Sequence, residues 1–183
     1  MQKINYFEIL EELALLCSRS VFLAVSSSRS QLQKALTEAY EAETHATEIL
    51  NGLEGALFKD FLPPLERRSI AEASHRLCKI ISLSAQILSQ RTHRPLSEKH
   101  LNEARGCIEL SVILEESVTM LKKIKKPNQL PKSAEFRKIL NDLRISSRAA
   151  QKKQNQASQL LCELREELSA CFDGIIEIML CNI

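Results

Sequence analysis

The chain has 183 residues, 44% of them hydrophobic, which suits one domain or two small halves around an ordinary core. Four glycines, no tryptophan and 4% aromatic residues argue against β architecture and favour an all-α fold. The 25 basic and 23 acidic residues leave a net charge of +2, too small a global field to predict nucleic-acid binding.

Apolar runs and cysteines indicate the compartment. No apolar run approaches the ~18 residues that a membrane-spanning helix needs, and the first residues lead into acidic ones and not into a signal peptide's apolar core. The six cysteines form no CxxC pair, and several lie on or beside apolar helix faces. We interpret them as reduced core residues and not as disulfides or metal ligands. We therefore expect a cytoplasmic protein.

Apolar residues at helical spacing predict a first helix over about 6–25 and a second over about 30–57. The second stripe advances in alternating steps of three and four residues and comprises Leu32, Leu36, Ala39, Glu43, Ala46, Leu50, Leu53 and Leu57. Glu43 stands in its middle. An unpaired buried carboxylate is costly, so Glu43 needs a metal, a basic partner or water, unless it lies at the edge of the stripe and reaches solvent.

Proline-containing breaks separate the next helices. The sequence predicts a third helix over about 64–90 and a fourth over about 97–121. From residue 133 one apolar register continues to Ile178, and a single helix of that length would be roughly 65–70 Å long. We place a reversal in the polar stretch 151–156, giving helices over about 133–153 and 158–180. The alternative is an uninterrupted helix, which would need a second chain to cover it.

These elements predict an all-α fold of six antiparallel helices, arranged as two three-helix bundles, because short connections favour antiparallel neighbours. The first half covers residues 1–94 and the second covers residues 95–183. We expect the two halves to form a single compact domain.

A basic run follows the fourth predicted helix and comprises Lys122, Lys123, Lys125, Lys126 and Lys132. Lysines in a last turn complement the helix dipole, and the proline at 127 stops the helix. The alternative is a functional role, in which the run meets a membrane surface or an acidic partner.

Three blocks of the first half carry a family resemblance. Residues 5–13 read NYFEILEEL, an aromatic pair leading into a helix, and residues 41–50 read EAETHATEIL. Residues 61–70 read FLPPLERRSI, which is similar to a family pattern written FiTPiDReDI. These blocks resemble the PhoU-like proteins, specifically the branch of phosphate-transport accessory proteins associated with Pit-type permeases. The second half resembles the family only in length, helix count and a faint pattern.

The resemblance implies metal clusters of iron or zinc, bound by carboxylates four residues apart on one helix that face three aspartates on the next. In this chain Glu43 matches one carboxylate position of the second helix, but Ala39 stands at the other. The aspartate positions of the third helix carry Cys78, Lys79 and Ser82. In the second half, by a less certain alignment, Arg144 and Arg148 replace acids, while Asp173 and Glu177 remain. We expect that the family's metal clusters are lost and that the protein has no cofactor.

The substitutions suggest a counter-charge site. Lys79 would face Glu43, and Arg148 would face Asp173 or Glu177, so that a fixed cation takes the place of the metal. One alternative is that these charges are merely solvated. Another is that Glu43, Asp173 and Glu177 still hold an ion.

No catalytic motif is present in the sequence. The four histidines are not at zinc spacing, and there is neither a glycine-rich phosphate loop nor GxSxG. We predict a non-enzymatic regulator or accessory protein of inorganic phosphate transport that acts through protein–protein contact. Its partner would be a phosphate permease at the inner face of the inner membrane, with Lys122 to Lys132 as the contact surface. A homodimer or a helical oligomeric scaffold is the remaining alternative.

Overall fold

The structure is a computed structural model that describes residues 5–60, 63, 65–96, 98–122, 133–148 and 156–181. Within these residues every regular element is an α-helix, which confirms the predicted all-α class. The helices are α1 (Tyr6–Ser26), α2 (Leu32–Lys59), α3 (Arg67–His93), α4 (Glu98–Met120), α5 (Ser133–Arg148) and α6 (Gln156–Cys181).

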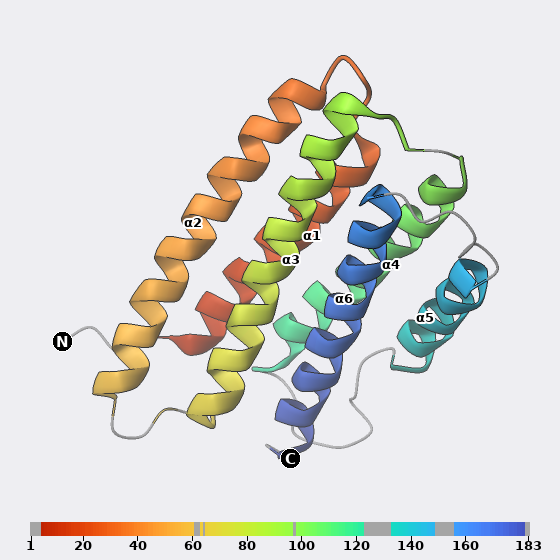
Figure 1. Cartoon of the computed structure of the whole chain (residues 1–183). Helices are drawn as coiled ribbons and strands as arrows, with labels where there is room; N and C mark the ends of the chain where they lie inside the picture. The colour runs from red at the N-terminus through yellow and green to blue at the C-terminus, as the bar shows by residue number, and fades with distance from the viewer. Residues whose placement is uncertain are drawn as a thin grey trace.

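The six helices run alternately in opposite directions and pack as two related halves (Figure 1). In the first half α2 packs against α1 and α3, and in the second α5 packs against α4 and, less extensively, α6. The halves share one core, because α1 also packs against α4 and α3 against α6. The helices α2 and α5 therefore form the two flanks of a central group of four.

Apolar side chains at helical spacing fill the centre of this group. Each of the four central helices contributes fully buried side chains, among them Leu10, Leu13, Leu77, Ile80, Leu110, Leu114, Leu164 and Phe172. Burying one such side chain contributes about 1.5–3 kcal/mol. The core is therefore the main source of stability.

Side chains terminate α1 at both ends. The Glu8 N–H donates to Asn5 Oδ1 at 3.4 Å, which caps the first turn. At the other end Arg91 of α3 donates to the carbonyl oxygens of Ala24 at 2.6 Å and Ser27 at 2.7 Å. Burial lowers the pKa of Arg91 from its ordinary value. This arginine satisfies carbonyl groups that a helix end leaves without partners.

Side-chain contacts of Arg67 and Tyr6 join the end of α2 to α3 and α1. Arg67, the first residue of α3, donates from Nε to the Leu57 carbonyl oxygen at 3.1 Å and from Nη2 to the Asp60 carbonyl oxygen. Tyr6 of α1 donates its hydroxyl to Asp60 Oδ2 at 2.9 Å. In this structure the arginine of the family-like pattern is a helix cap. The first turn predicted for α3, at residues 64–66, is not helical where the structure describes it.

The long apolar register of the second half belongs to two helices. Helix α5 ends at Arg148 and α6 begins at Gln156, and the two lie side by side while both pack on α4. The alternative of one uninterrupted helix is therefore wrong. The predicted turn at 151–158 lies mostly outside the described residues.

A glycine allows α5 to approach α4 closely. A Cβ atom built on Gly106 of α4 would lie 2.6 Å from Leu143 Cδ2 of α5. Leu143 is itself buried, so any side chain at position 106 would force it to move.

None of the helices in the described ranges has the length and apolar character needed to cross a membrane.

Candidate functional site

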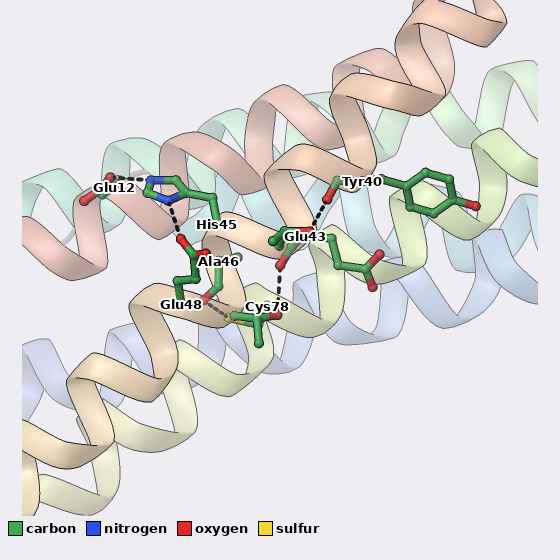
Figure 2. Close-up of polar contacts among 9 residues, drawn as sticks. Glu12, Tyr40, Glu43, His45, Ala46, Glu48 and Cys78 are labelled. Atoms are coloured by element: carbon green, nitrogen blue, oxygen red, sulfur yellow. Dashed lines mark hydrogen bonds and ion pairs between the residues drawn. The ribbon is translucent and has the colours of Figure 1, made fainter.

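The interface between α2 and α3 is where the resemblance would place metal-binding carboxylates, and small neutral side chains fill it. Ala39 and Ala46 of α2 are fully buried. The thiol of Cys78 on α3 donates to the Ala46 carbonyl oxygen, with Sγ at 3.6 Å (Figure 2). Burial raises the pKa of the Cys78 thiol to about 11, so it is neutral at physiological pH. Around Cys78 the two helices meet through neutral groups, and one turn earlier on α3 His75 Nε2 lies 2.9 Å from Glu54 Oε1 of α2.

Glu43 is half-buried, which fits the interpretation that it lies at the edge of its stripe. Its carboxylate makes no ion pair or hydrogen bond with any residue that the structure describes, whereas its backbone carbonyl accepts from Thr47 at 2.8 Å (Figure 2). The ion pair expected between Glu43 and Lys79 is not formed. Consecutive helix residues are rotated by about 100°, so when Cys78 faces α2 its neighbour Lys79 faces α6.

Lys79 belongs instead to a cluster of four charges between α3 and α6. Its Nζ lies 2.7 Å from Glu167 Oε1 and 3.5 Å from Glu163 Oε1, and Arg76 Nη1 lies 3.3 Å from Glu167 Oε2. The hydrogen bond to Glu167 raises the pKa of Lys79. Two cations and two anions balance one another and join the two halves. Because most of these side chains are partly exposed, each pair contributes at most about 1 kcal/mol.

In the second half a different arginine takes the role predicted for Arg148. Asp173 Oδ1 on α6 lies 3.3 Å from Nη2 of Arg137 on α5. Arg148 stands eleven residues further along α5, about 16 Å away along the helix axis. The antiparallel register places the other end of α5 beside Asp173. The predicted contact of Arg148 with Asp173 or Glu177 stays a prediction. The Arg148 side chain itself lies outside the described part.

The three acids of the ion-site alternative do not come together. Glu43 is on α2, Asp173 and Glu177 are on α6, and α3 lies between these helices. Glu177 instead lies near the start of α3. The pKa of Arg68 is raised there by the hydrogen bond to Glu72 and, more weakly, by the charge of Glu177. A shared ion among the three carboxylates is excluded by this arrangement.

Comparisons with known proteins identify the fold. No family model and no curated protein matches the sequence. The structure matches a PhoU-like protein from Shewanella oneidensis MR-1 with a TM-score of 0.60 and 13% identity, over 97% of each chain. It also matches a protein of the same organism described as a PhoU-like phosphate regulatory protein, with a TM-score of 0.58 and 12% identity over 97% of this chain and 96% of that one. The chain has a PhoU-like fold.

The PhoU-like match spans both halves, including the second half, where the sequence carried only a faint pattern. It does not separate one branch of PhoU-like proteins from another. The assignment to a branch associated with Pit-type permeases stays a prediction.

The most deeply buried ion pair described in this PhoU-like fold joins α4 to α6. Arg165 Nη1 lies 2.9 Å from Glu103 Oε1, and the side chains are 5% and 9% exposed. Arg165 also donates from Nη2 to Glu166 Oε1 at 3.0 Å and to Cys162 Sγ at 3.0 Å. Breaking a buried pair of this kind is strongly destabilising, because it leaves one charge buried and uncompensated.

The sequence analysis did not find this pair, because it followed apolar residues alone. The sequence shows apolar residues at helical spacing at Leu101, Ala104 and Ile108. In the structure Leu101 and Ile108 are only partly buried, whereas Glu103 and Cys107 are buried. Helix α4 packs against α1, α5 and α6, so its buried face is wider than one stripe. The sequence signal for this pair is an acidic residue, Glu103, and a basic residue, Arg165, each next to an apolar stripe of its own helix.

The expected basic contact surface is described at one residue only. Lys122 Nζ lies 2.6 Å from Glu11 Oε2 of α1, and the lysine side chain is 36% exposed. The other lysines of this run, Lys123, Lys125, Lys126 and Lys132, lie outside the described residues. In this PhoU-like fold Lys122 therefore ties the end of α4 to the start of α1.

The six cysteines are free, and three of them are buried. Burial raises the pKa of Cys107 and Cys171 to about 12, and it raises that of Cys17 well above its ordinary value. Cys181, at the end of α6, is exposed. A search of the described ranges finds no group of three or more histidine, cysteine or acidic residues that could hold a metal ion.

Proposed function

We propose that this protein is a non-enzymatic regulator or accessory protein of inorganic phosphate transport that acts through protein–protein contact. The observation that carries this proposal is the PhoU-like fold over 97% of the chain, shared with a protein described as a phosphate regulatory protein. The side chains support contact over metal chemistry. Ala39 and Cys78 occupy positions where the resemblance implies acids, and Lys79 is paired with acids of α6.

The proposed partner is a phosphate permease at the inner face of the inner membrane, where the protein would be cytoplasmic and peripheral. The support is the resemblance to accessory proteins of Pit-type permeases together with the basic run Lys122 to Lys132. A run of lysines suits the acidic lipid headgroups that surround such a permease. Because Lys122 is held by Glu11, the contact would rest mainly on the lysines that follow it.

Phosphate uptake in the native host tests the proposal. Deletion of the gene should change the rate of phosphate uptake or its response to external phosphate, and the wild-type gene should restore it. A variant with Glu at positions 123, 125 and 126 should fail to restore the response and should no longer co-purify with the permease. The matched control is Arg68→Glu, which reverses a charge on α3, where the Arg68 side chain is 81% exposed. Unchanged uptake and unchanged response after deletion would refute a role in phosphate transport.

A further inference from the structure

A groove runs along the surface between α1 and α2 and continues onto the exposed face of α2. Three shallow cavities of about 360, 230 and 410 Å³ follow one another along it. The first two share Leu23 and Glu38, and the second and third share Glu41 and His45, so they form one continuous depression. On the α2 side its lining extends from Gln31, the residue before α2, to Glu48, about 25 Å at 1.5 Å per residue.

The groove combines exposed aromatic rings with a hydroxyl that has no partner. Phe22 and Tyr40 line its two end cavities and are 54% and 48% exposed. Leu16 and Leu23 are partly buried and line the middle cavity. Ser20 also lines the middle cavity, is fully buried, and its hydroxyl has no hydrogen-bond partner among the described residues. Exposed aromatic residues above a partly apolar floor are typical of a surface that receives another side chain.

The uncompensated charge of the groove is negative. Arg19 Nη2 lies 3.2 Å from Glu38 Oε2, and Lys34 Nζ lies 3.9 Å from Glu38 Oε1. Both cations are therefore already paired. The Glu41 carboxylate has no ion pair with any described residue. Glu48 approaches only His45, at 3.9 Å (Figure 2). From residue 5 to residue 60, the part containing α1 and α2, there are nine acidic and four basic residues. An occupant would therefore carry positive charge.

We infer that this groove docks an amphipathic helix of a partner protein, with apolar residues on one face and lysine or arginine beside them. A groove about 25 Å long accommodates about 17 helical residues, and an apolar helix face laid into a groove is a common mode of recognition. The basic residues would pair with Glu41 and Glu48. The inference goes beyond the proposed function and does not depend on a role in phosphate transport.

The chain's own basic helix does not suit this groove. Helix α5 lies on the opposite flank of the molecule (Figure 1). Its buried apolar residues Leu140 and Leu143 are already covered within its own chain, and Leu143 packs against α4. The free side of α5 offers Ile145 as its exposed large apolar residue among those that the structure describes, which is fewer apolar anchors than an apolar helix face provides. A partner with a free apolar face fits better.

Binding of a set of synthetic helical peptides tests the inference. Each peptide has about 17 residues, with Leu, Ile or Phe at helical spacing and Lys on both borders of that face. At low ionic strength we expect saturable binding by fluorescence anisotropy. The double variant Phe22→Ala/Tyr40→Ala should lose about tenfold or more in affinity. Phe58→Ala, which removes a 92% exposed ring of α2 outside the groove, should bind like wild type.

Charge variants give a second, independent arm. Glu41→Lys/Glu48→Lys should weaken binding strongly at low salt and much less at high salt, because exposed charges are screened. Glu72→Lys on α3 is the control and should have no effect. Circular dichroism of every variant checks that the fold is retained. Binding of no peptide in the set, equal binding of a peptide with Glu in place of Lys, or equal loss in Phe58→Ala would overturn the inference. Self-association abolished by the Phe22/Tyr40 double variant would also overturn it, since the occupant would be a second copy.

Discussion

The buried ion pair between Glu103 and Arg165 allows the sharpest test of how the two helices of the second half are held. We consider the replacement Arg165→Met, which keeps the volume and apolar stem of the side chain but removes its charge. Glu103 would then be left 9% exposed with its main cationic partner gone. Removing one partner of a buried pair typically costs about 3–5 kcal/mol. Glu103→Leu should also be destabilising, because it removes the most buried carboxylate beside Arg165, although Arg165 keeps its ion pair with Glu166.

The double variant Glu103→Leu/Arg165→Met should behave differently from the sum of the two. With both charges gone, no buried ion remains and the two apolar side chains can pack across α4 and α6. Replacing a whole buried pair is often neutral or stabilising. We therefore expect the double variant to lie within about 1 kcal/mol of wild type, with a coupling energy of several kcal/mol.

Urea unfolding followed by circular dichroism measures these free energies, and thermal unfolding gives an independent value. For a chain of this length, 1 kcal/mol shifts Tm by about 2–4 °C, so each single variant should lose roughly 6–20 °C. Tyr40→Ala, which removes a half-exposed ring, is a control expected to change little. Single variants as stable as wild type, or a double variant whose loss equals the sum of the singles, would show that the pair is not buried as described.

Four further outcomes are expected. Gly106→Val should destabilise the fold by about 1–3 kcal/mol and expose α5 to limited proteolysis, because the new side chain occupies the space of Leu143. Protection of α5 equal to wild type would contradict the close approach of α5 to α4. Cys181 should react rapidly with a thiol reagent at pH 8, whereas Cys107 and Cys171 should react only on unfolding. Burial in the folded state raises the pKa of these two thiols from 9.0 to about 12. Their contribution to the free energy of unfolding is therefore complete below about pH 9 and is lost as the pH rises toward 12, by on the order of 1 kcal/mol per pH unit for each thiol. Urea unfolding at pH 8 and pH 10 would detect this loss. Protein purified without chelators should contain less than one equivalent of iron or zinc by elemental analysis, and a stoichiometric metal would contradict the loss of the clusters.

The helices could be predicted from the sequence because their apolar stripes are regular. All six were placed within a few residues of the observed bounds, and the break at 61–70 was located by its prolines. The reversal between α5 and α6 was harder, because the register from Phe136 to Ile178 does not slip. Length decided it, since a helix that long does not fit within one compact domain.

The contacts between charged residues could not be predicted in the same way. Lys79 and Cys78 are neighbours in the sequence but face different helices, so a motif aligned residue by residue assigned both to the same interface. Arg137 and Arg148 are both on α5, and only the antiparallel register decides which of them meets Asp173. Stripes determine which face of a helix is buried. They do not determine which helix covers it.

The α2–α3 interface also indicates that restoring one acid would not restore a metal site. On α2 one carboxylate position carries Ala39, which is fully buried. On α3 one aspartate position carries Cys78, whose thiol donates a hydrogen bond to the Ala46 carbonyl oxygen. A lone Asp at position 78 would be partly buried against these neutral groups and would be protonated or would push the helices apart. At least two acids facing Glu43, together with space for the ion, would be needed at once. Small side chains therefore occupy these positions of the interface, and we expect the functional contacts to lie on the outer surfaces of the protein.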